Sequence, residues 1–505
     1  MRLSTLLDMA ADGFGDRVLI GGRKAGITGA ELARRSHAGA HALRERGADS
    51  LVYLGVNGPA FPVALFAAAR AGVPLVPLNF RLGEQQLAAL LTKHPNALGV
   101  ADPGARIHLE RAGIPSITPQ EWLETAASGS GRVEEPGDDG DGDGVAAVIY
   151  TSGTTSEPKG VLLRHSNLVS YVLGTVEFAA AGEEEAALVS VPPYHIAAVA
   201  NVITNLFAGR RTVVIEGFTP TEWLRTVREE AVTNAMVVPT MLARLVESDQ
   251  DVSLPSLRSL SYGGAPMPGP VIEKALATWP EVGFVNAYGL TETSSTIALL
   301  GPEDHRRAQA ATDPAGRARL RSAGRALPGV EIEIRDPEGN PLGPLEPGRV
   351  FVRGGQISAE YAGIGQALDE QGFFDTRDEG YLDAEGYLFL GGRTDDTIIR
   401  GAENVAPAEI EEVLLRHPQV QDAAVFGVAD REWGQRIEAA VVSRPGSPVD
   451  AGELRDFTRL TLRSSRTPDR FWFVEELPRT ETGKLIRRRV ADAVARANGA
   501  DGVPV

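Results

Sequence analysis

Residues 145–160 read VAAVIYTSGTTSEPKG, an apolar run followed directly by a turn dense in hydroxyl groups and glycine. A short apolar run bounded by such a turn is typical of a buried strand. In the turn, small residues let the backbone approach a ligand, hydroxyl and amide groups can donate hydrogen bonds, and Lys159 supplies a positive charge. This composition favours a phosphate-binding loop, although the GxxxxGK[ST] order of a Walker A loop is absent. A polar surface loop is an equally good interpretation of composition alone.

Helix and strand patterns alternate on the N-terminal side of this stretch. Residues 29–47 place apolar groups at helical spacing and end in glycine, and a strand-like run at 51–56 follows; residues 60–79 repeat the order. This alternation predicts an α/β body with mostly parallel sheets. The acidic, glycine-rich residues 134–144 are interpreted as a linker between subdomains, because Tyr150 stands where a calcium-binding loop of the EF-hand type needs glutamate.

A second boundary is expected near Arg393. Residues 380–392 alternate as in a hairpin, residues 407–420 have helical spacing, and residues 422–428 resemble a strand. The chain beyond the boundary, about 110 residues, is within the usual range for a domain. We therefore expect a large domain over 1–392 and a small one over 396–505, joined at 393–395.

Composition excludes several classes of protein. The 505 residues are 43% hydrophobic and 23% charged, which suits a globular chain with a sizeable interior. The net charge of -17 argues against nucleic-acid binding, and the absence of cysteine excludes disulfides, thiolate catalysis and zinc–thiolate sites. Lysine is scarce among the 50 basic residues, and it offers a compact point charge that arginine cannot reproduce. The lysines are Lys24, Lys93, Lys159, Lys274 and Lys484.

The first residues, MRLSTLLDMAADGFGD, lack the long apolar core and cleavage site of a secretory signal. The most apolar stretch, residues 61–78, is interrupted by Arg70 and by prolines, so no membrane span is expected. A cytoplasmic location is the default expectation.

Five motifs, in order along residues 150–490, resemble those of the adenylate-forming superfamily of acyl-CoA synthetases, adenylation domains and luciferases. They are YTSGTTSEPKG (150–160), YGGAP (262–266), NAYGLTET (286–293), DEGYLDAEGYLFLGGRTDD (378–396) and PRTETGKL (478–485). The resemblance implies an α/β fold with a large N-terminal body of stacked, mostly parallel sheets and helices, and a small mobile α+β C-terminal lid. It also implies that ATP and Mg²⁺ activate a carboxylic acid to an acyl-adenylate with release of pyrophosphate, and that the acyl group then passes to CoA.

The resemblance assigns three catalytic candidates. Lys484 is expected to bridge the substrate carboxylate and the α-phosphate, and its alternative is a solvated residue of the arginine-rich tail. Glu292 is expected to bind Mg²⁺ together with Thr155, and its alternative is a capping residue. His195 is expected to line and gate the acyl pocket rather than act as a base, and its alternative is a core histidine.

The resemblance also assigns a nucleotide site. Tyr288 is expected to stack on or border the adenine, and Asp378 and Arg393 are expected to bind the ribose. The remaining candidates are Thr151, Ser152, Gly153, Thr154, Thr155 and Lys159 in the phosphate loop, and Gly263, Gly264, Ala265, Pro266, Asn286, Ala287, Gly289 and Thr291 in the two segments on the adenine side.

Three further positions concern the lid. Asp395 matches the hinge, with a solvated loop aspartate as its alternative. Gly401 matches the passage for the pantetheine arm, where only a small residue leaves room. Trp433 matches a position that can contact the CoA nucleotide, and an edge-packed core tryptophan is an equal alternative.

Some positions depart from the family pattern. Ser156, Arg377, Ala198 and Ala402 replace glycines, and the stretch with Ser465 and Asp469 lacks an aromatic and a basic residue that are common there. Because Ala402 and Asp469 fall where CoA would dock, the acceptor stays open.

CoA is the first choice of acceptor, and the phosphopantetheine of a carrier protein is the second. Release of the free acyl-adenylate is a weaker option. A non-catalytic acyl-nucleotide binding protein is disfavoured by the joint presence of Lys484, Glu292 and Asp378. A homodimer is an open alternative to a monomer.

The acid is expected to be apolar and to carry no amino group. Residues 195–209 and 235–245 supply small and aliphatic side chains, Ala287 offers no cation for a second carboxylate, and no carboxylate lies between His195 and Gly209 to bind an ammonium. We therefore expect a fatty, bulky or aromatic monocarboxylic acid, of fatty acid or secondary metabolism.

Overall fold

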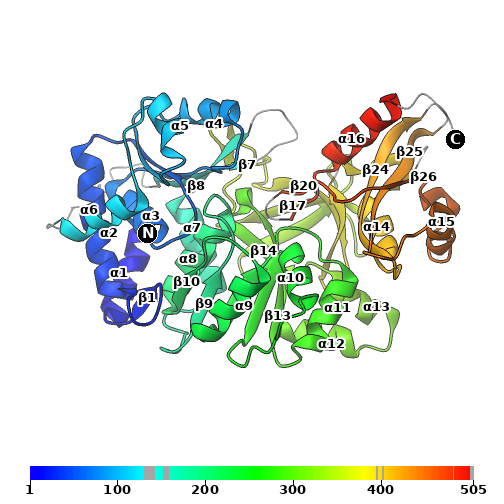
Figure 1. The fold of residues 1–505 in the computed structure, drawn as a ribbon, viewed down its shortest axis with the longest axis horizontal. Coiled ribbons are helices and arrows are strands. Elements are labelled where there is room, and N and C mark those ends of the chain that lie inside the picture. Colours follow the sequence, from blue (N-terminus) through cyan, green and yellow to red (C-terminus); the bar gives the residue numbers. More distant parts are fainter. Residues whose placement is uncertain are drawn as a thin grey trace.

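The computed structural model describes residues 1–129, 143–151, 158–393, 396–400, 403–430, 433–480 and 483–500. Most of the expected linker at 134–144 lies outside these residues. Figure 1 shows a large N-terminal body, with the C-terminal residues gathered in a smaller unit at one end.

The largest sheet of the body has nine strands among the described residues, and its centre is parallel. One antiparallel strand then leads the chain back from the carboxyl end of β13. In spatial order the strands are β15 (Arg325–Ala326), β14 (Ser295–Leu300), β13 (Gly283–Leu290), β12 (Ser259–Gly263), β11 (Asn234–Val237), β9 (Ala186–Val189), β10 (Arg211–Val214), β1 (Val18–Ile20) and β2 (Ile27–Thr28).

A second sheet, of eight strands, contains the expected strand at 145–150. This strand is parallel to its neighbour on one side and antiparallel to the strand that follows the phosphate-loop motif. In spatial order the strands are β19 (Gly365–Gln366), β18 (Glu360–Tyr361), β8 (Lys159–Arg164), β7 (Val145–Thr151), β4 (Leu75–Pro77), β3 (Ser50–Leu54), β5 (Ala97–Ala101) and β6 (Ser116–Ile117).

Helices fill the space around these sheets and form one core with them. Every residue of α3 (Ala60–Ala71) is buried, and one apolar cluster joins it to strands of both large sheets. The other helices of the body are α1 (Leu3–Phe14), α2 (Gly29–Glu45), α4 (Glu84–Leu91), α5 (Arg106–Arg111), α6 (Pro119–Ser128), α7 (His165–Thr175), α8 (Ile196–Ala208), α9 (Pro220–Glu229), α10 (Pro239–Val246), α11 (Gly269–Thr278), α12 (Pro302–Ala310) and α13 (Pro314–Ala318), with short 3₁₀ turns η1 (Thr291–Thr293) and η2 (Arg319–Arg321).

A four-stranded antiparallel sheet connects the body to the C-terminal domain. It consists of β16 (Val330–Arg335), β17 (Gly348–Gly354), β20 (Phe374–Leu382) and β21 (Leu388–Arg393). The last two strands form the hairpin expected at 380–392, with Asp378 opposite Arg393. The ribose candidates therefore lie at the end of this hairpin, where the chain leaves the body.

The C-terminal domain has its own core, built on a sheet of five strands. The helix and strand expected at 407–420 and 422–428 are present as α14 and β24. The elements are β22 (Ile398–Arg400), β23 (Glu403–Val405), α14 (Pro407–Leu415), β24 (Val420–Asp430), β25 (Gly434–Ser443), α15 (Ala451–Arg459), η4 (Ser464–Arg466), β26 (Arg470–Phe473) and α16 (Arg487–Ala500). The predicted fold class is confirmed, and we call this domain the lid.

No helix in the described part of the chain is long and apolar enough to cross a membrane.

Candidate active site

A cleft of about 2070 Å³ lies between the body and the lid. Many of the residues selected from the sequence contribute to its walls. They are Gly264, Ala265, Pro266, Asn286, Ala287, Tyr288, Gly289, Asp378 and Lys484. The fold therefore brings together the segments predicted to face the adenine, the aspartate predicted to bind the ribose and the lid lysine, although up to 220 residues separate them along the chain.

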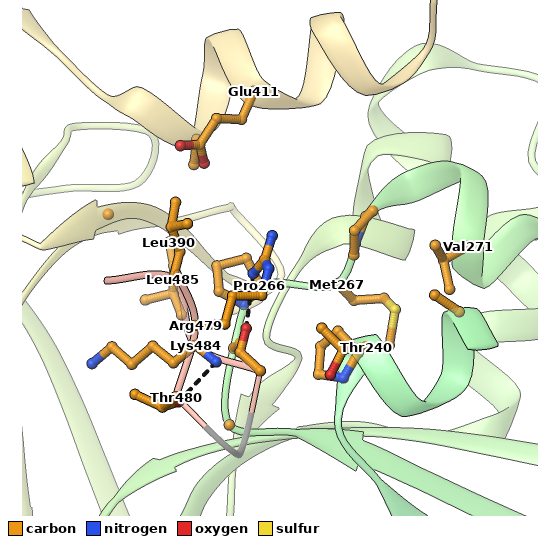
Figure 2. Close-up of a pocket in the computed structure, with 18 of the residues that line it drawn as sticks. Thr240, Pro266, Met267, Val271, Leu390, Glu411, Arg479, Thr480, Lys484 and Leu485 are labelled. Carbon is orange, nitrogen blue, oxygen red and sulfur yellow. Dashed lines mark hydrogen bonds between the residues drawn. The ribbon is translucent and has the colours of Figure 1, made fainter. Parts of the chain in front are cut away.

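Lys484 is exposed on a tight turn of the lid. The Thr480 amide donates to the Lys484 carbonyl at 2.7 Å, the Lys484 amide donates to the Thr480 hydroxyl at 3.0 Å, and the Gly483 amide donates to the Thr480 carbonyl at 2.8 Å. We call residues 478–480 and 483–485 the lysine turn. In Figure 2 the Lys484 side chain extends on the side of this turn away from Thr240.

The lysine turn docks on the body through Gly483. This glycine has a φ of +75°, and a Cβ atom there would overlap the side chain of Thr240, which lies in the first turn of α10. Only glycine meets both conditions without strain.

Asp378, the predicted ribose ligand, is a buried carboxylate of the cleft wall, with 9% of its surface exposed. The Tyr288 hydroxyl donates to its Oδ2 atom at 2.5 Å, and the Asp378 amide donates to the Thr376 hydroxyl at 3.1 Å. Tyr288 therefore holds the carboxylate in place, a contact that the sequence did not reveal. Arg377, which replaces the family glycine, has a φ of +61°, the left-handed region that glycine adopts most easily.

Backbone packing on the adenine side requires glycine at two positions. A Cβ atom at Gly263 would overlap the Ala287 carbonyl, and one at Gly289 would overlap the Ser295 carbonyl. Behind this surface the buried Tyr262 hydroxyl contacts His305 Nε2 at 2.9 Å, while His305 Nδ1 donates to the Gly301 carbonyl at 2.8 Å. Glycine at these positions therefore lets the backbone pack closely beneath the part of the cleft wall that Gly264, Ala265 and Ala287 form.

We expect the replacement of Asp378 with asparagine to raise KM for ATP about tenfold, because hydrogen bonds to a charged acceptor are stronger than those to an amide. Initial-rate measurements with varied ATP test this. The matched control is Asp375→Asn, which changes a nearby carboxylate of β20 that pairs with Arg349 and accepts from the Arg377 amide. An equal rise in KM for both variants would contradict a specific role of Asp378.

Glu292 and Lys159 are brought together by Tyr361, which sequence reasoning missed. The Tyr361 hydroxyl donates to Glu292 Oε1 at 3.0 Å, and the Lys159 ammonium lies 5.7 Å from the centre of the Tyr361 ring. The Glu292 backbone carbonyl accepts from the amides of Ser358 and Ala359 at 2.9 and 3.0 Å. Because β18 pairs with β8, the fold places Tyr361 beside the strand that begins at Lys159.

The surroundings of Glu292 fit the Mg²⁺ ion that the family resemblance implies. No group of three or more acidic or histidine side chains that could hold a metal occurs among the described residues. Mg²⁺ commonly uses one or two carboxylates together with phosphate oxygens and water, so a single glutamate beside a phosphate-loop lysine is a suitable donor set. The second metal candidate, Thr155, lies outside the described residues, and so do the phosphate-loop candidates Ser152, Gly153 and Thr154. Thr151 is the last residue of β7 and lies opposite Lys159.

His195 precedes α8 and lies against the Tyr194 ring, with 4.8 Å between ring centres. Burial lowers the pKa of His195 to about 4, so the ring is neutral near pH 7. A neutral ring adds no charge beside the small and aliphatic side chains of α8. Some of the predicted site residues do not belong to the described residues that line the cleft itself. They are His195, Glu292, Lys159, Gly263 and Thr291.

The low pKa of His195 predicts a loss of stability in acid. The unfolded chain takes up the proton near the ordinary histidine pKa of 6.5, whereas the folded chain does so only near 4, so stability is complete above 6.5 and is lost as pH falls toward 4. We expect the replacement of His195 with glutamine to remove about 1 to 2 kcal/mol of this loss at pH 5. Urea unfolding at several pH values tests this, with the exposed His41→Gln as control; an unchanged pH slope in the His195 variant would refute the expectation.

On the lid, Trp433 is 46% exposed, which disagrees with the alternative of a core tryptophan. The guanidinium of Arg400 lies 5.5 Å from the centre of its ring and pairs with Asp469 at 2.5 Å. Asp469 also accepts from the Ile437 amide at 3.0 Å. Asp469, one of the departures from the family pattern, is thus a structural partner of Arg400. Gly401 and Asp395 lie outside the described residues, and only the backbone of Arg393 is described.

Among the described residues, two ion pairs join the lid to the body in this arrangement. Arg321 of η2 pairs with Glu412 of α14 at 2.6 Å, and Arg444 of the lid pairs with Glu247, next to α10, at 3.5 Å. The Thr397 hydroxyl also donates to Glu379 at 3.1 Å. These contacts, together with Gly483 on Thr240, favour the lid position in which the lysine turn adjoins the cleft.

Comparison with known proteins agrees with this site. Residues 7–362 match the family model of the AMP-binding enzyme, and residues 409–484 match that of the AMP-binding enzyme C-terminal domain. Feruloyl-CoA synthase of Amycolatopsis sp is 34% identical over 486 residues, 92% of this chain and 93% of that protein. The fatty acid–[acyl-carrier-protein] ligase ScoC of Streptomyces coeruleorubidus is 32% identical over 488 residues, 92% and 91% of the two chains.

The solved structure of o-succinylbenzoate CoA synthetase from Bacillus subtilis with its acyl-adenylate intermediate is also similar. Its TM-score is 0.83 at 29% identity, over 96% of this chain and 97% of that chain. The same enzyme is known in complex with ATP and magnesium ion.

The fold and the cleft thus define a nucleotide-dependent ligase. The chain belongs to the AMP-binding enzyme family, within the adenylate-forming superfamily of acyl-CoA synthetases. The predicted class, an AMP-forming acid–thiol ligase, is confirmed.

Proposed function

We propose that this enzyme activates an aromatic monocarboxylic acid with ATP and Mg²⁺ and transfers the acyl group to CoA. The observation that carries the proposal is the docking of the lysine turn on Thr240 at the cleft that Tyr288 and Asp378 line. A carboxylate is a weak nucleophile that meets charge repulsion as it approaches a phosphate. A mobile ammonium at this point therefore lowers the barrier by electrostatic stabilisation.

The remaining roles are those that the family resemblance implies, and the positions of the described residues support them. Asp378, held by Tyr288, accepts hydrogen bonds from the ribose hydroxyls, with Arg393 opposite it on β21. Glu292 contributes a carboxylate oxygen to Mg²⁺ while Tyr361 occupies its other oxygen. The ion supplies charge neutralisation on the phosphates when it is bound. Asp395 is the hinge about which the lid turns between the two steps.

Two observations support an aromatic acid. Two of the three relatives named above, feruloyl-CoA synthase and o-succinylbenzoate CoA synthetase, are named for acids that carry an aromatic ring. In this chain His195 is neutral and α8 supplies aliphatic side chains behind it, of which Val199, Val202 and Ile203 are buried. Ala287, which lines the cleft, has a small side chain that leaves room for a ring.

CoA is the acceptor that the lid suits best. The exposed ring of Trp433 offers an aromatic face that suits an adenine, and Arg400, which is paired with Asp469, lies against this ring. The similarity to ScoC supports a carrier protein as the alternative acceptor. A cytoplasmic location follows from the use of ATP and CoA.

A screen of pyrophosphate release tests the proposal. Ferulic, benzoic, indoleacetic, fatty and amino acids are each supplied with ATP and Mg²⁺, without an acceptor, with CoA, or with a phosphopantetheinylated carrier protein. We expect acid-dependent release with aryl acids and a thioester that forms with CoA. Release that prefers fatty acids, or a thioester that forms only on the carrier protein, would overturn the corresponding part of the proposal.

A further inference from the structure

Arg479 is the residue that fixes the lysine turn to the lid. Its Nη1 atom donates to the Gly483 carbonyl at 2.8 Å. Its Nε and Nη2 atoms form a fork on the Asp422 carboxylate, with distances of 3.1, 2.7 and 2.9 Å. The guanidinium thus connects the turn to β24, the longest strand of the lid among the described residues.

Partial burial and two-point geometry hold the Arg479–Asp422 ion pair in one orientation. The side chains of Arg479 and Asp422 are 27% and 28% exposed, so water screens the pair less than it screens surface pairs. The planar fork of arginine fits a carboxylate at two points, which fixes direction as well as distance. Figure 2 shows Arg479 beside Thr480 and Lys484, within the turn that faces Thr240.

The peptide that Arg479 holds is the one that meets the body. Gly483 touches Thr240, and Lys484 is the next residue. A shift of the Gly483 carbonyl therefore moves both the contact with the body and the origin of the lysine side chain. Small displacements of an aligned group are costly in catalysis, because the reacting atoms must be held in a narrow range of positions.

We propose that Arg479, oriented by Asp422, is the positioning residue that aligns Lys484 for acid adenylation. The proposal rests on the function proposed above. It assigns Arg479 no contact with the nucleotide, because Nε and Nη2 are engaged by Asp422 and Nη1 by the Gly483 carbonyl. Since the role proposed for Lys484 belongs to the first step, Arg479 should matter for adenylation and not for transfer of a preformed acyl-adenylate to CoA.

Partial reactions test the proposal with Arg479→Lys and Asp422→Asn. Lysine keeps the charge but cannot reproduce the fork, and asparagine keeps the shape but not the charge. We expect each change to lower kcat of acid-dependent pyrophosphate–ATP exchange about tenfold, with KM for ATP unchanged. Thioester formation from synthetic acyl-adenylate and CoA should stay at the wild-type rate. Arg488→Lys, the same change at an exposed position of α16, is the matched control and should leave both steps unchanged.

Three outcomes would overturn the proposal. Loss of both partial reactions, with a lower melting temperature, would mean that Arg479 only stabilises the lid. A raised KM for ATP with kcat unchanged would mean that it contacts the nucleotide directly. Full exchange activity in both variants would mean that the turn needs no such support.

A measurement without catalysis separates this proposal from the proposed function. Hydrogen–deuterium exchange of peptides that contain residues 478–486 should be faster in Arg479→Lys than in the wild type and in Arg488→Lys. If the wild type shows no acid-dependent exchange of pyrophosphate, the proposed function fails, while this measurement still decides whether Arg479 orders the turn. Unchanged protection in Arg479→Lys would refute the positioning role.

Discussion

Replacing Lys484 with alanine should lower acid-dependent pyrophosphate–ATP exchange by about 100- to 1,000-fold, the effect of removing one well-placed group that stabilises charge in a transition state. The reason is the position of the lysine turn, which meets the body at Thr240 beside the cleft. Exchange of labelled pyrophosphate into ATP, with and without the acid, measures the first step alone.

The matched control for Lys484 is Lys24→Ala, which removes an exposed lysine near the N-terminus. Thioester formation from synthetic acyl-adenylate should survive in the Lys484 variant, because the carboxylate has by then been activated. Undiminished exchange in this variant would refute the mechanism. An equal loss in both partial reactions would assign Lys484 to the integrity of the lid instead.

Replacing Gly483 with alanine should also act on the first step, with a loss of about 100-fold in exchange. Overpacking typically costs about 1–3 kcal/mol, and a 100-fold loss corresponds to about 2.7 kcal/mol. The strain of a non-glycine residue at a φ of +75°, about 1–2 kcal/mol, is present whether or not the lid is docked. The overlap of the new methyl group with Thr240 exists only while the lid is docked, so it destabilises that position of the lid selectively.

Gly446 offers a control that isolates the contact with the body. It lies in the lid with a φ of +72°, and a Cβ atom there would meet nothing within 4 Å. Gly446→Ala therefore carries the same backbone strain without the overlap and should keep its exchange activity. The double variant Gly483→Ala, Thr240→Ala should recover part of the loss; no recovery would mean that backbone strain, and not docking, causes the defect.

The sequence predicted the secondary-structure elements that local residue patterns determine. The helix at 29–45, the hairpin at 380–392 and the strand at 145–151 follow from periodicity and glycine placement, because each depends on neighbours along the chain. The motifs also selected residues that do meet at one cleft, since the family resemblance carried information about the fold.

The supporting contacts could not be predicted in this way. Tyr288 reaches Asp378 across 90 residues, Tyr361 reaches Glu292 across 69, and Arg479 reaches Asp422 across 57. Each depends on the register of strands from different parts of the chain, and no periodicity encodes such a pairing. The pKa of His195 depends likewise on burial that only the assembled body provides.

The ion pairs Arg321–Glu412 and Arg444–Glu247 have a consequence for turnover. Every catalytic cycle must break and re-form both pairs if the lid turns away after adenylation. Their side chains are 24% to 45% exposed, and pairs of this kind contribute about 0 to 1 kcal/mol each. Pairs this weak should favour the lid position seen here and still break readily at room temperature. Because salt screens them, higher ionic strength should change the relative rates of the two half-reactions.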